Sequence, residues 1–97
     1  MKLEGKSIVV TGASAGMGQA IVTLFAQEGA NIIAVARRKE RLEALAEELK
    51  DAPGKVVPYA GDVSDPAVCE GMIDAAVKEF GRLDVLVNNA GTGVVIK

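Results

Sequence analysis

The sequence contains no histidine, no tryptophan and only one cysteine among its 97 residues. A lone cysteine cannot form an internal disulfide, and without histidine a zinc site is not expected. Lysine plus arginine number 11 and aspartate plus glutamate number 13, so a general polyanion binder, which needs a basic surface, is excluded. No apolar run approaches the roughly 20 residues of a membrane span, and the N-terminus has no signal-peptide pattern. We therefore expect a cytoplasmic protein without a metal site.

The residues that are present give an ordinary globular composition, 49% hydrophobic and 25% charged, with 11 glycines. This composition excludes a disordered, collagenous or disulfide-built chain. The length is sufficient for one domain, which we expect to cover residues 1–97 without a linker.

Short apolar runs alternate with helical patterns along the whole chain. We expect strands at 7–11, 32–36, 55–60 and 83–88, and helices at 16–28, 38–50 and 66–80. Asp65 followed by Pro66 is typical of a helix start, and Gly81 of a helix end. The last helix is expected to bury Met72, Ile73, Ala76, Val77 and Phe80. This β-α-β-α-β-α-β order predicts an α/β fold with a doubly wound parallel sheet.

A glycine-rich turn joins the first expected strand to the first helix. The usual G-x-G-x-x-G spacing of dinucleotide sites is not met, because position 21 is Ile21. Nevertheless, Gly12 permits a tight turn, Gly16 lets the backbone approach a pyrophosphate, and Gly18 lets the helix pack closely on the sheet. The helix N-terminus then offers N–H groups to the anion. We interpret the turn as nucleotide-binding, with a plain glycine-rich connector as the alternative.

The second expected strand ends in two arginines. Folds that bind NAD usually place an acid about twenty residues after the glycines, on the adenosine ribose. Here Ala36 is followed by Arg37 and Arg38, whose guanidinium groups suit bidentate contact with a ribose 2′-phosphate. We therefore expect NADP rather than NAD as the cofactor. The alternative is a solvated first helical turn, although arginines at a helix start are unfavourable for its dipole.

Polar residues also follow the third and fourth expected strands, at the edge where ligands collect in such folds. Asp62 is suited to accept a hydrogen bond from an adenine amino group, or to serve a local turn with Ser64 and Asp65. Asn88 and Asn89 can lock neighbouring backbone or line a cofactor, and alone they would be a turn signal.

In this order, these residues resemble the short-chain dehydrogenase/reductase family over nearly the whole chain. The likeness rests on Thr11-Gly12 with Gly16 and Gly18, on Asp62-Val63, on Phe80-Gly81-Arg82-Leu83-Asp84 and on Asn88-Asn89-Ala90-Gly91. The resemblance implies a partial Rossmann fold with strand order 3-2-1-4 and a nicotinamide dinucleotide. The implied cofactor-binding residues are Gly12, Ser14, Ala15, Gly16, Met17, Gly18, Asp62, Val63, Asn89, Ala90 and Gly91. Ala36 then Arg37 looks like the NADP-preferring pattern, although Ala15 stands where some NADP-binding members carry a basic residue.

The sequence departs from the family at the catalytic residues. The resemblance implies a catalytic tyrosine, with a lysine four positions later, beyond the Asn-Asn-Ala-Gly turn, after which this sequence has six residues. The only tyrosine, Tyr59, has Val63 four positions on and does not match. No catalytic residue is carried over, and we expect the NADP-binding half of an oxidoreductase, inactive on its own.

Two alternatives stay open. The chain could be a truncated or engineered fragment that folds as a self-associating structural unit without useful cofactor binding. An apolar fourth strand at the sheet edge, Val85-Leu86-Val87, would favour pairing with a second copy. It could also be a portion of an intact NADP-dependent oxidoreductase. For the chain we expect a homo-oligomer joined at the exposed fourth-strand edge and neither a nucleic-acid nor a membrane partner.

Overall fold

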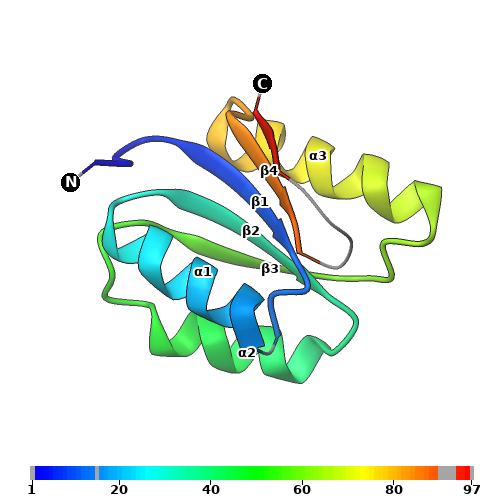
Figure 1. Ribbon diagram of the computed structural model, residues 1–97, viewed down its shortest axis with the longest axis horizontal. Helices are drawn as coiled ribbons and strands as arrows, with labels where there is room; N and C mark the ends of the chain where they lie inside the picture. Colours follow the sequence, from blue (N-terminus) through cyan, green and yellow to red (C-terminus); the bar gives the residue numbers. More distant parts are fainter. Residues whose placement is uncertain (1, 15, 90–93, 97) are drawn as a thin grey trace.

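The computed structural model describes residues 2–14, 16–89 and 94–96. Its elements, in chain order, are β1 (Ser7–Thr11), α1 (Gly16–Gln27), β2 (Asn31–Ala36), α2 (Lys39–Glu48), β3 (Val56–Ala60), α3 (Pro66–Phe80), β4 (Val85–Asn88) and β5 (Val94–Ile96). The first four strands run parallel in the order β3-β2-β1-β4 (Figure 1). The predicted α/β architecture and strand order 3-2-1-4 are confirmed.

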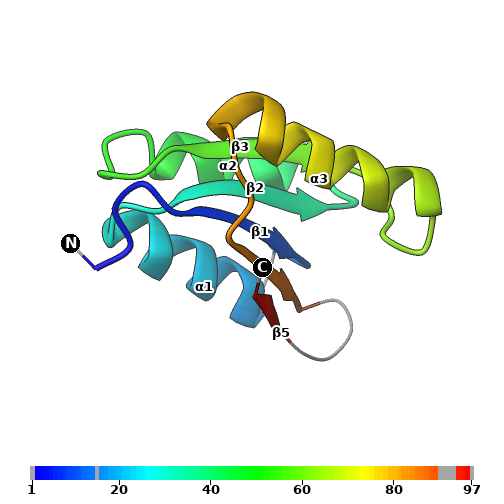
Figure 2. The ribbon, with the colours of Figure 1, turned by 90° about the horizontal axis from the view of Figure 1, so that it is seen from above.

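Helices cover both faces of the sheet, and Figure 2 shows α1 and α3 on opposite sides of it. Alternate residues of β1 therefore enter different cores. Ile8 and Val10 pack with Val22 of α1 and Leu42 of α2, whereas Val9 packs on the α3 side. The central strands β1 and β2 are buried on both faces, which explains their continuous apolar sequence.

Local signals fix the start and the end of α3. The Asp65 carboxylate accepts a hydrogen bond from the Ala67 N–H at 2.9 Å, with Pro66 in the first turn. Gly81 ends the helix in the left-handed conformation, with φ of 79°. Within the described ranges, no helix combines the length and the apolar character that a bilayer crossing requires.

The predicted inner face of α3 is correct at its centre and wrong at one flank. Met72 and Ala76, one helical turn apart, are buried against the sheet. Val77, expected to face inward, is 51% exposed. Each residue turns the helix by about 100°, so Val77 lies to the side of the line that Met72 and Ala76 press onto the sheet.

An additional strand lies beside β4. β5 pairs antiparallel with β4, with Leu86 opposite Val95 in the register. The expectation that β4 forms an exposed edge is therefore wrong, because β4 lies between β1 and β5. A homo-oligomer joined on this side stays a prediction, and a second copy would meet β5 there.

Candidate functional site

A cleft of about 660 Å³ opens at the carboxyl ends of the parallel strands. Its walls come from the ends of β1, β2, β3 and β4 and from the loops that follow them. The lining residues are Gly12, Ser14, Val35, Ala36, Arg37, Arg38, Gly61, Asp62, Val63, Ser64 and Asn88. Ligands bind at this edge in open α/β sheets, so the cleft is the candidate site.

The glycine turn forms one wall of the cleft. Gly12 has φ of 65°, a left-handed conformation that strongly favours glycine. A Cβ atom on Gly18 would overlap the carbonyl oxygen of Gly12 and lie 2.9 Å from Nδ2 of Asn89. Because Gly18 has no side chain, the first turn of α1 packs directly on the loop that leaves β1. The predicted tight turn and close helix packing are both confirmed.

The end of β4 is tied to the same turn. Asn89 donates a hydrogen bond from Nδ2 to the carbonyl oxygen of Gly12 at 3.3 Å. On the neighbouring strand, the Thr11 hydroxyl lies 3.1 Å from Oδ1 of Asn88 and 3.4 Å from the carbonyl oxygen of Val87. The backbone-locking role is therefore observed for Asn89, while Asn88 also lines the cleft.

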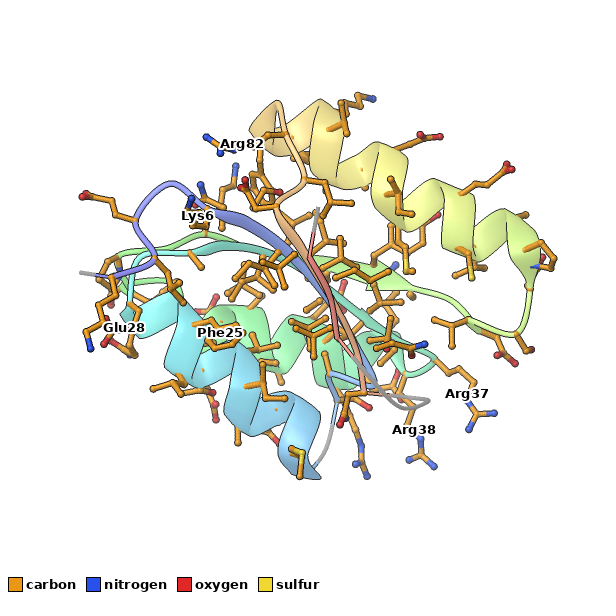
Figure 3. All side chains as sticks on the ribbon, turned by 45° about the horizontal axis from the view of Figure 1, so that its top comes forward. Lys6, Phe25, Glu28, Arg37, Arg38 and Arg82 are labelled. Carbon is orange, nitrogen blue, oxygen red and sulfur yellow. The ribbon has the colours of Figure 1, made fainter. Side chains whose placement is uncertain are left out.

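Two arginines follow the end of β2 in the cleft lining. Arg37 follows β2 directly, and Arg38 is the N-cap residue of α2 without a capping side-chain hydrogen bond. Both are exposed, and Figure 3 shows their side chains extending outward from this end of the molecule. Neither forms an ion pair with another residue in the described part of the chain. Their charge is consequently available to an anionic ligand.

The loop after β3 supplies a carboxylate. Asp62 accepts a hydrogen bond on Oδ1 from the Ser64 N–H at 3.0 Å, which forms the local turn considered from the sequence. The N–H and hydroxyl of Ser64, together with the charge of Arg37, hold the pKa of the Asp62 carboxyl below its usual value. Asp62 is therefore ionised at neutral pH and brings a negative charge to the cleft.

Six of the predicted site residues meet in the cleft lining, namely Gly12, Ser14, Arg37, Arg38, Asp62 and Val63. Gly16, Met17, Gly18 and Asn89 belong to the glycine turn or to the end of β4 but not to the lining. Ala15, Ala90 and Gly91 lie outside the described residues. Sequence reasoning left Val35, Ala36, Gly61 and Ser64 out of the predicted site, while Asn88, which it offered as a residue that can line a cofactor, does lie in the lining. Their common signal is position, since each lies at or just after the carboxyl end of a strand.

Two further side chains lie behind the loop that carries Asp62. The Cys69 thiol contacts the carbonyl oxygen of Val63 at 3.1 Å. The ring of Tyr59 packs among apolar residues, and its hydroxyl fills the space that a Cβ on Gly71 would need. Tyr59 therefore has a packing role here. In the ranges that the structure describes, no group of three or more His, Cys, Asp or Glu residues could hold a metal ion.

Comparison with known proteins identifies close relatives. Residues 6–96 match the short chain dehydrogenase family. The chain is 48% identical over 91 residues to a 3-oxoacyl-(acyl-carrier-protein) reductase of Thermotoga maritima, covering 94% of this chain and 37% of the relative. It is 46% identical to D-threitol dehydrogenase of Mycolicibacterium smegmatis, covering 93% of this chain and 35% of that enzyme. The chain thus spans just over a third of the length of these relatives.

Solved structures show the same fold. L-sorbose reductase from Gluconobacter frateurii, complexed with NADPH and L-sorbose, superimposes with a TM-score of 0.85 at 43% identity over 94% of this chain and 35% of that one. A short chain dehydrogenase from Burkholderia cenocepacia in complex with NADP gives 0.87 at 33% identity, over 95% of this chain and 38% of that one. The family match and these likenesses lead to one conclusion: the chain belongs to the short-chain dehydrogenase family.

Proposed function

We propose that this chain binds NADP(H) and supplies that binding to a hydride-transferring oxidoreductase of its family. The adenosine 2′-phosphate would lie beside Arg37, and the pyrophosphate at the start of α1. The observation that carries the proposal is the pair of exposed arginines in the cleft wall, at the strand end where NAD-binding folds place an acid. That the solved relatives include complexes with NADPH and NADP supports the same cofactor.

The residues of the turn fit a pyrophosphate. The first N–H groups of a helix have no partner within the helix, so those at the start of α1 are available to an anion. α1 contains no Asp or Glu, so no acidic side chain of this helix repels the phosphates. Around Gly16, apart from its chain neighbours and the backbone of its own helix, no atom lies within 4 Å of the position of a Cβ, so a ligand can approach the backbone closely.

The other lining residues fit the adenosine. Val63 is partly exposed and gives the cleft apolar surface for a base, and the Asp62 carboxylate gives it a hydrogen-bond acceptor. When bound, the nicotinamide of this cofactor carries the hydride in family reactions. The residues described here bind and orient the other end of the molecule. In a full-length oxidoreductase of this family, the activity and the choice of substrate accordingly depend on residues outside this cleft.

The proposal is tested by calorimetric titration of the chain with NADP⁺ and, separately, with NAD⁺. A charge-assisted hydrogen bond contributes about 1.5 to 3 kcal/mol, so we expect NADP⁺ to bind roughly tenfold to a hundredfold more tightly. Raising the salt concentration should reduce the difference, because Arg37 and Arg38 are exposed. Equal affinities for the two dinucleotides, or no binding of either, would contradict the proposal.

A further inference from the structure

Opposite charges stand on neighbouring strand ends of the cleft. β2 and β3 pair in parallel as far as Ala36 and Ala60, and the Gly61 N–H then donates to the Ala36 carbonyl oxygen at 2.9 Å. Arg37 is the next residue after Ala36, and Asp62 is the next residue after Gly61. The hydrogen bond between their predecessors therefore holds the two residues on neighbouring strand ends, and both line the cleft.

Neither charged group is neutralised by a contact ion pair within the described residues. The Asp62 carboxylate is fixed by the Ser64 N–H within its own loop, and it is ionised at neutral pH. Arg37 extends from the strand end without an ion pair closer than 4.0 Å in the described part of the chain. Without a contact ion pair, the two groups act on each other through their electrostatic fields.

We propose that Asp62 limits the preference of the cleft for a 2′-phosphorylated cofactor, by acting as a competing counter-charge to Arg37. The proposal rests on the proposed binding of NADP(H). A 2′-phosphate carries negative charge, so the Asp62 carboxylate repels it and offsets part of the attraction by Arg37. The 2′-hydroxyl of NAD carries no charge and escapes this repulsion. A contact between Asp62 and adenine would serve both dinucleotides equally, so it cancels in the ratio of their affinities.

The test compares Asp62→Asn with the wild-type chain in titrations with NADP⁺ and NAD⁺ at low salt. Asparagine keeps the Oδ1 acceptor for the Ser64 N–H, so the local turn is retained while the charge is removed. We expect the ratio of NADP⁺ to NAD⁺ affinity to rise about threefold to tenfold. The gain should shrink in 0.5 M salt, where the screening length is roughly 4 Å. Asp74→Asn is the matched control, since it removes an exposed aspartate outside the cleft lining.

The outcomes separate this inference from the proposed function. If the wild-type chain prefers NADP⁺ but Asp62→Asn leaves the ratio unchanged or lowers it, the inference alone is wrong. It is equally overturned if Asp74→Asn raises the ratio as much. If the wild-type chain has no preference for NADP⁺, the proposed function fails and the inference fails with it.

A second readout needs no nucleotide. An NMR titration of the Asp62 carboxyl in Arg37→Gln should show a higher pKa than in the wild-type chain at low salt. An unchanged pKa in that variant would overturn the electrostatic coupling between these two residues.

Discussion

At the amino ends of β1 and β4, Ser7 and Asp84 bond to each other, whereas at the carboxyl ends of β2 and β3, Arg37 and Asp62 line an open cleft. The Ser7 N–H donates to the Asp84 carboxylate at 2.8 Å, and the Asp84 N–H donates to the Ser7 carbonyl oxygen at 2.9 Å. Arg82 adds an ion pair to Asp84 at 2.7 Å. At this end the Asp84 carboxylate is therefore bonded to Ser7 and paired with Arg82, whereas at the other end Arg37 has no ion pair within the described residues.

We infer that the amino end of the sheet contributes mainly to stability and the carboxyl end mainly to ligand binding. The hydrogen bonds between Ser7 and Asp84 at the amino end join segments that are far apart in sequence, so their loss should appear in stability. At the carboxyl end Arg37 has no ion pair in the part of the chain that the structure describes, so its loss should appear in ligand binding. Matched substitutions at the two ends should therefore change different properties, stability at the amino end and ligand affinity at the carboxyl end.

The largest effect should come from a matched pair of glycines. A Cβ on Gly18 would overlap the Gly12 carbonyl oxygen at the carboxyl end, and a Cβ on Gly54 would overlap the Ala30 carbonyl oxygen at the amino end. Because backbone must shift in both cases, we expect each alanine variant to lose about 3 kcal/mol of unfolding free energy in urea. Only Gly18→Ala should also weaken NADPH binding by the folded protein. Equal weakening in Gly54→Ala would break the division.

The next effect separates two exposed arginines. Arg37→Gln should weaken NADP⁺ binding roughly tenfold to a hundredfold, with NAD⁺ binding and Tm nearly unchanged, because a charged contact to phosphate is lost. Arg82→Gln should lower Tm and leave both affinities unchanged, because Arg82 bonds to Asp84 at the amino end. Calorimetric titration and thermal melts measure the two responses. A lower Tm in Arg37→Gln with unchanged affinity would reverse the assignment.

Acid should destabilise the fold through Asp84 at the amino end of β4. The Arg82 side chain, the Ser7 N–H and the charge of Lys6 hold the pKa of the Asp84 carboxyl below its ordinary value of 3.8. The fold thus favours the ionised form, and this stabilisation is present above the unfolded pKa and lost as pH falls through the folded one. We expect Tm to fall as the pH drops below about 4.

Two asparagine variants test the source of this acid dependence. Asp84→Asn should flatten the fall of Tm with pH more than Asp62→Asn does. The reason is that Asp84 joins β1 to the segment before β4, whereas Asp62 bonds within its own loop. Thermal melts from pH 7 down to pH 2 measure both slopes. If Asp62→Asn flattens the fall of Tm more than Asp84→Asn does, Asp84 is not the main source of the acid dependence.

The smallest effect concerns the wall behind the cleft. Cys69→Ser keeps a donor for the Val63 carbonyl oxygen, so we expect a loss of about 1 kcal/mol of unfolding free energy or less. NADPH affinity should stay within roughly twofold of the wild-type value. A loss of tenfold or more in a calorimetric titration would extend the ligand-sensitive region from the cleft into α3.

Local signals in the sequence predicted most of the fold. The β-branched run Ser7–Thr11 became β1 with those bounds, and the Asp65-Pro66 start and the Gly81 end define α3 as expected. These signals act within a few residues and need no tertiary information. Predictions that depend on contacts across the fold were less complete. Val77 is exposed because of how α3 sits on the sheet, and β5 pairs with β4 through a three-residue strand with no distinctive pattern.

In the candidate site, too, residues with a local sequence signal could be predicted, and residues placed by contacts across the fold could not. Gly12, Arg37 and Asp62 could be predicted because strand ends at one edge of a parallel sheet must come together. Val35 and Ala36 were not predicted as lining residues, because both are buried core residues that reach the cleft lining only through their place at the end of β2. The bond between Ser7 and Asp84 spans 77 positions, and only the pairing of β1 with β4 brings the two residues together.

The most direct test is an NMR titration of the isotopically labelled chain with NADPH, followed through its backbone amide signals. We predict saturable shifts at the carboxyl end, at Gly12, Ser14, Arg37 and Asp62, with the signals of Ser7 and Asp84 at the amino end unmoved. Shifts centred on Ser7 and Asp84, or no saturable shift at any residue of the cleft, would contradict the account.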